Sequence, residues 1–154
     1  MLNLGRSLLL SGVIAVTGFV AQATPWQDQA LAAADRFAER IEVLDEALHE
    51  AYEQQQSPEF LKAIEDIHHI EAVLTKLRQD IPTAPFADLC HLRNHLLEDL
   101  TQIRLDLIAL GLQSNPKVVQ TWNAMANSYN NDLNRYFQQC PANWAKCMAT
   151  IGNL

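Results

Sequence analysis

Residues 26–52 read WQDQALAAADRFAERIEVLDEALHEAY, a stretch without glycine or proline. Apolar residues recur in it at alternating spacings of four and three, namely Ala30, Ala34, Phe37, Ile41, Leu44, Leu48 and Ala51. Residues at these spacings share one face of an α-helix. The stretch therefore predicts a long helix with one apolar face.

Three further helices are expected after this one, and each begins at a proline that suits a first helical position. Their predicted spans are 58–80, 85–110 and 116–139, with a short terminal helix over 144–151. Short connections between four long helices predict an all-α fold, an antiparallel up-down-up-down four-helix bundle. Arg93 falls within the apolar stripe of the third helix, near its start, and we expect its guanidinium to reach solvent at the end of the bundle.

Residues 1–23 have the pattern of a cleaved secretory signal peptide. Arg6 supplies the positive charge, residues 8–20 form an apolar run of 13, and Ala21-Gln22-Ala23 is a small-x-small cleavage box. The alternative, a permanent membrane anchor, needs a run of about 20 apolar residues. The sequence thus predicts a helical-bundle domain over 24–154 that is periplasmic or secreted, with no membrane attachment after cleavage.

The mature protein is expected to begin at Thr24, directly after the Ala21-Gln22-Ala23 box. N-terminal sequencing of the exported protein checks this. Recovery of a chain that retains Met1 in a membrane fraction would contradict both the cleavage and the location.

The net charge of the chain limits the classes of molecule that it is expected to bind. The chain has 11 basic and 18 acidic residues, a formal net charge of −7. Binding to nucleic acid needs a basic face that neutralises phosphates, so this class of partner is not expected. Anionic membrane surfaces are disfavoured for the same reason.

Two polar stripes are the candidate surfaces for a protein partner. The first lies along one side of the first helix and consists of Glu39, Glu42, Glu46, Glu50 and Glu53. Opposed charge steers association, so this acidic stripe suits a basic partner. The second stripe follows the fourth helix beside its apolar face and consists of Asn123, Asn127, Asn130 and Asn134. The ordinary alternative for both is a solvated helix face.

Histidines suggest a metal site as the alternative function. Asp88, His91, His95 and Glu98 share one face of the third helix, where His91 and His95 at i, i+4 can both reach one Zn²⁺ or Cu²⁺ ion. Two Glu-x-x-His patterns, which end at His49 and His68, point away from the apolar stripes. We therefore expect no metal centre in the core, and the absence of Cys-x-x-Cys-His excludes covalent haem attachment.

No catalytic pattern is present: there is no Gly-x-Ser-x-Gly, phosphate-binding glycine loop or His-Glu-x-x-His. The sequence predicts a non-catalytic module without a cofactor that binds another protein, as an inhibitor, immunity factor, adaptor or chaperone does. A homo-oligomer is compatible with these features.

Three cysteines, Cys90, Cys140 and Cys147, make one disulfide and one leftover thiol the natural arrangement in an oxidising compartment. Cys90 lies 24 residues before residue 114 and Cys140 lies 26 after it, so the two are level in an antiparallel helix pair. This favours Cys90–Cys140. Cys140–Cys147 and Cys90–Cys147 remain alternatives, as does the absence of a bridge.

Overall fold

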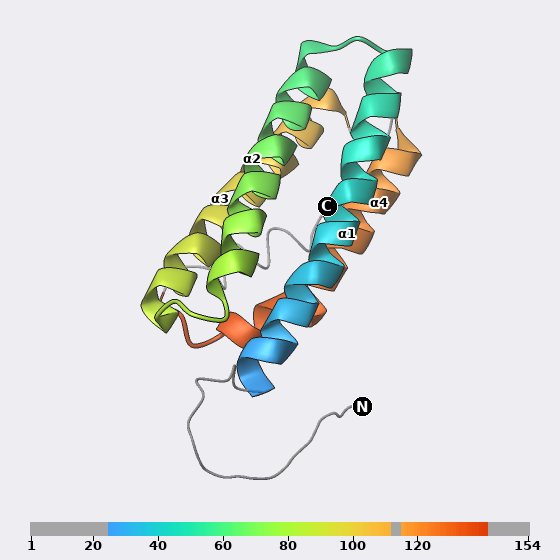
Figure 1. The fold of residues 1–154 in the computed structure, drawn as a ribbon. Helices are drawn as coiled ribbons and strands as arrows, with labels where there is room; N and C mark the ends of the chain where they lie inside the picture. Colours follow the sequence, from blue (N-terminus) through green and yellow to red (C-terminus); the bar gives the residue numbers. More distant parts are fainter. Residues whose placement is uncertain (1–24, 112–114, 142–154) are drawn as a thin grey trace, which may run out of the picture.

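The computed structural model describes residues 25–111 and 115–141, and in this part of the chain it is all helical. The described residues form four long α-helices, followed by a short 3-10 helix, and Figure 1 shows the long helices packed side by side. They are α1 (Pro25–Gln54), α2 (Pro58–Asp80), α3 (Phe86–Leu110), α4 (Pro116–Asn131) and η2 (Leu133–Phe137). The predicted all-α bundle is confirmed.

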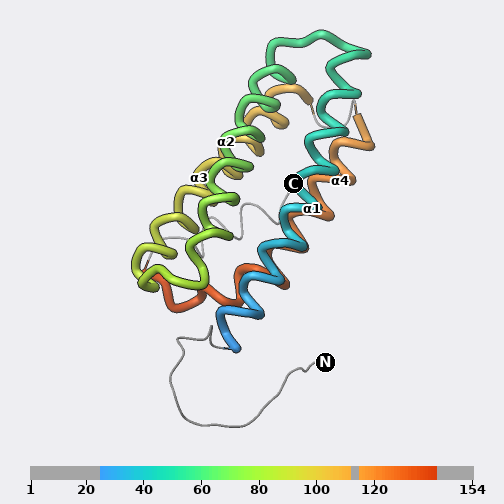
Figure 2. The backbone as a smooth tube through the Cα atoms, viewed as in Figure 1, coloured from blue at the N-terminus to red at the C-terminus, as the bar shows by residue number. Residues whose placement is uncertain are grey.

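Successive helices run in opposite directions, as the tube in Figure 2 shows. α1 packs against both α2 and α4, and α2 also packs against α3. The predicted apolar stripes meet along the axis, where Phe37, Ile67, Leu100 and Trp122 are at most 1% exposed. Burial of these faces supplies the main stabilisation of such a bundle.

Two helix starts follow directly from the sequence. The Ser57 hydroxyl accepts a hydrogen bond from the backbone N–H of Glu59, and Pro58 follows at the first helical position. The side chain of Asn115 caps α4 in the same way by accepting from the N–H of Val118 at 3.2 Å. Each cap satisfies an N–H that would have no partner within its helix.

The predicted end of the fourth helix is wrong. The α-helix stops at Asn131 rather than near Cys140, and Asp132 leaves helical geometry at φ −123° and ψ −81°. The Asp132 carboxylate accepts two hydrogen bonds from Arg36 of α1, at 2.7 and 2.8 Å. The chain then continues as η2 across the base of the bundle, the end where α1 begins (Figure 1).

Burial of Arg93 is a second departure from expectation. Its side chain is 0% exposed, and its guanidinium donates to the backbone oxygen of Phe137 at 3.4 Å and to Oδ1 of Asn94 at 3.0 Å. The prediction of a solvent-exposed guanidinium is wrong because η2 covers the base of the bundle. The apolar pattern of α3 alone does not indicate that η2 covers Arg93.

Cys90 and Cys140 form a disulfide, with their Cα atoms 5.5 Å apart. The favoured pairing is confirmed, and the bridge ties the segment after η2 to the first turns of α3. The predicted signal peptide, the predicted helix over 144–151 and Cys147 lie outside the described residues. None of the described helices is both long and apolar enough to cross a membrane.

Candidate functional site

The glutamate face, which consists of Glu39, Glu42, Glu46, Glu50 and Glu53, lies on the outer side of α1. All five residues are exposed, because the apolar seam of α1 points to the opposite side. The residue Val43 lies among them and is 47% exposed. The sequence-based placement of this stripe on an outward face is therefore correct.

Few positive charges offset the glutamate face. Lys117 of α4 pairs with Glu50 at 2.6 Å. Arg36 is held by Asp132, and Arg78 pairs with Asp35 at 2.8 Å. Among the described residues, the other four glutamates form no ion pair.

The asparagine stripe is interrupted. Asn127 is exposed, and Asn123 and Asn130 are partly exposed, but Asn134 is only 8% exposed. The α-helix has ended before Asn134, which lies in η2 and turns inward. The four amides therefore do not form one continuous exposed row.

The predicted metal ligands on α3 share an exposed face. Asp88, His91, His95 and Glu98 are all exposed, and Nδ1 of His95 lies 3.5 Å from the Glu98 carboxylate. No three of them place ligand atoms within 4.8 Å of one another. A metal site at these residues stays a prediction.

A different set of ligand-type side chains converges between α1 and α2. Asp45 and His49 of α1 and His68 of α2, the His/Asp cluster, each place one ligand atom within 4.8 Å of the others. Nδ1 of His49 lies 3.0 Å from Oδ1 of Asp45, and the two imidazole centroids are 6.3 Å apart. Asp45 is partly buried, whereas both histidines are exposed.

Carboxylates border this cluster. Glu71 lies one turn beyond His68, and its carboxyl group interacts with that of Asp45. Partial burial, and then the nearby Asp45 charge, raise the pKa of Glu71 above its ordinary value; His68 opposes this rise. The carboxyl groups of Asp45 and Glu71 thus lie close together beside the imidazole of His68.

Residue spacing along one helix does not reveal the His/Asp cluster, because its members belong to two helices. The signal that finds it is their distance from the α1–α2 loop. Asp45 lies 11 residues before Gln56 and His68 lies 12 after it, so the two are level in the antiparallel pair. The same reasoning correctly predicts the Cys90–Cys140 disulfide.

A second pair of carboxyl groups lies between α2 and α3. Asp66 and Asp106 are 8% and 6% exposed. Nζ of Lys62 lies 3.6 Å from Asp66 and 4.0 Å from Asp106, and Gln102 donates to Asp106 at 3.1 Å. Burial, reinforced by the hydrogen bond with Asp66, raises the pKa of Asp106 to about 7.

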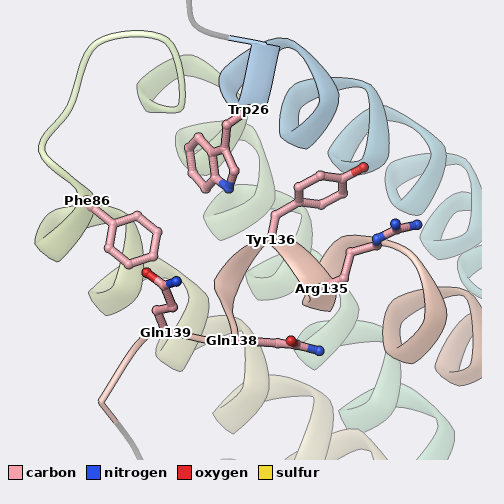
Figure 3. Close-up of a pocket in the computed structure, with 6 residues that line it drawn as sticks. All are labelled: Trp26, Phe86, Arg135, Tyr136, Gln138 and Gln139. Atoms are coloured by element: carbon pink, nitrogen blue, oxygen red, sulfur yellow. The ribbon is translucent and has the colours of Figure 1, made fainter.

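The base of the bundle has an aromatic hollow of about 360 Å³. Figure 3 shows the rings of Trp26, Phe86 and Tyr136 around it. Trp26 and Phe86 also contact each other edge to face, with centroids 5.6 Å apart. Its other lining side chains, Arg135, Gln138 and Gln139, are all exposed. We assign no ligand to this hollow, since none of the described side chains that line it is a buried polar group able to orient one.

The described fold and surface define an antiparallel four-helix bundle with one acidic outer face. Comparison with known protein families, with curated proteins and with solved structures finds no match to this chain. Its function must therefore be argued from the residues themselves.

Proposed function

We propose that this protein is a non-catalytic binding module whose glutamate face docks a protein partner with a basic surface. The observation that carries the proposal is the excess of negative charge on this face, most of which no ion pair offsets. Of its five exposed glutamates, only Glu50 forms an ion pair within the described part of the chain. Complementary charges accelerate the association of two proteins, and a negative face favours a partner with a positively charged surface.

The geometry of α1 supports docking in two ways. The glutamates project from one 30-residue helix, Pro25–Gln54, whose other side is packed against α2 and α4, so the face is presented on a rigid element. Val43, 47% exposed, supplies an apolar contact among the charges. Protein interfaces commonly combine apolar contacts with charged groups in this manner.

Charge reversal of the glutamate face tests this proposal. We expect the triple variant Glu42→Lys, Glu46→Lys, Glu50→Lys to lose the partner captured by the wild-type protein from a native periplasmic or secreted extract. The fold is expected to persist, because exposed substitutions usually change stability by less than about 0.5 kcal/mol each. Capture is quantified by mass spectrometry, and circular dichroism reports the helix content.

A matched control places the same charge change elsewhere. Glu65→Lys, Asp88→Lys and Glu98→Lys alter exposed positions on α2 and α3, away from the glutamate face. This control should retain the partner at low salt, and raised ionic strength should weaken capture by the wild type. Equal capture by the wild type and both variants would place the contact surface elsewhere.

A further inference from the structure

We propose that the His/Asp cluster, formed by Asp45, His49 and His68, binds one divalent transition-metal ion between α1 and α2. This site goes beyond the proposed docking function and does not depend on it. Its ligands also differ from the set on α3 that the sequence pattern suggests.

The positions of the ligand atoms support this site. Tetrahedral Zn²⁺ holds its nitrogen and oxygen ligands at about 2.0–2.2 Å, which places neighbouring ligand atoms roughly 3.4 Å apart. The three ligand atoms of the cluster already lie within 4.8 Å of one another. His68 is exposed, so its side chain is free of core packing that would prevent it from closing the remaining distance.

One imidazole is already oriented for coordination. Nδ1 of His49 lies 2.9 Å from the backbone oxygen of Asp45, and a carbonyl oxygen can only accept a hydrogen bond. Nδ1 is therefore the donor in this contact, and Nε2 is the ring nitrogen left for a metal ion. Histidines that bind metals commonly donate their other ring N–H to a carbonyl or carboxylate oxygen in this way.

The donor set and its surroundings define the class of ion. Two imidazoles with one carboxylate suit Zn²⁺ or Cu²⁺ better than Mg²⁺ or Ca²⁺, which prefer oxygen ligands alone. Glu71 lies one turn beyond His68 on α2, and its charge interacts with that of Asp45, so a further carboxylate borders the cluster. Lys62, the basic side chain of the preceding α2 turns, points instead to Asp66 and Asp106.

Zinc titration of the untagged, chelator-treated protein tests the site by isothermal titration calorimetry. We expect one Zn²⁺ per chain and an upward shift of the Tm on binding. His49→Ala and His68→Ala should each weaken Zn²⁺ binding by about 100-fold or more, since even residues that only orient a ligand typically contribute 10- to 100-fold. Both side chains are exposed, so the metal-free variants should keep the wild-type Tm.

The chain offers close controls. His69→Ala removes the neighbouring exposed histidine of the same helix, and His91→Ala with His95→Ala removes the exposed pair of α3. Both controls should bind Zn²⁺ as the wild type does. The proposal is overturned if the wild type does not bind Zn²⁺, if His69→Ala weakens binding as much as His68→Ala, or if the α3 double variant alone abolishes it.

Discussion

Replacement of Cys90 and Cys140 by serine is expected to lower the free energy of unfolding by about 4 kcal/mol. The bridge joins residues 50 positions apart. Closing a loop of this length removes conformational entropy from the unfolded chain, and the chain-entropy relation gives about 4 kcal/mol for it at 25 °C. For a domain of this size, the loss corresponds to a decrease in Tm of roughly 15 °C.

The structure adds a local consequence to this prediction. Cys140 directly follows η2, which covers Arg93 at the base of the bundle. Without the bridge, the cover over the buried guanidinium should open more readily than the rest of the bundle. Hydrogen exchange is expected to show earlier loss of protection for η2 and the first turns of α3 than for α2.

Thermal and denaturant unfolding measure the effect of the disulfide. Reduction of the wild-type protein should reproduce the double serine variant, whereas Cys147→Ser is the matched control and should unfold as the wild type does. A wild-type Tm that does not change on reduction would contradict the prediction. Peptide mapping without reductant independently checks the Cys90–Cys140 pairing.

Asp106→Asn is expected to stabilise the protein at neutral pH, an unusual direction for a substitution at a buried residue. Asp106 is 6% exposed and lies beside the equally buried carboxyl of Asp66. Its pKa is raised from an ordinary value of 3.8 to about 7, first by burial and then by Asp66. Ionisation of Asp106 in the folded protein is therefore costly, and asparagine removes this cost while keeping a similar shape.

The pH dependence follows from the difference between the folded and unfolded states. Between pH 3.8 and about 7, the folded state keeps the Asp106 proton and the unfolded state has lost it. The bound proton therefore makes its whole contribution to the free energy of unfolding below pH 3.8. This contribution falls as the pH rises through the window and is lost above the folded-state pKa. Each pKa unit corresponds to about 1.4 kcal/mol, so the integrated loss amounts to a few kcal/mol.

Urea unfolding of the two proteins at several pH values measures this difference. We expect Asp106→Asn and the wild type to have similar stability near pH 4, and the variant to be more stable by several kcal/mol near pH 8. Asp88→Asn, at an exposed position of the same helix, should leave the wild-type pH profile unchanged. A variant that is less stable than the wild type at both pH values would show that the Asp106 carboxylate is instead held favourably by Lys62 and Gln102.

The sequence by itself determined the order of the four long helices and the starts of α2 and α4. Ser57 with Pro58, and Asn115 with Pro116, define two helix starts through hydrogen bonds within a few residues, so no tertiary information is needed. The apolar seams define the buried faces because the helical repeat is constant. Short loops then make neighbouring helices antiparallel, which is why counting residues from the α3–α4 loop was sufficient to predict the Cys90–Cys140 bridge.

Contacts between helices depend on how far one helix is shifted along its neighbour and on how it is rotated. Only the tertiary structure decided these contacts. The end of α4 at Asn131 accompanies the contact between Asp132 and Arg36, residues 96 positions apart in sequence. Burial of Arg93 depends on η2, and the convergence of Asp45 with His68 depends on how α1 lies against α2. A shift of one residue along either helix rotates a side chain by about 100°, so contacts between helices are set by packing that no single helix encodes.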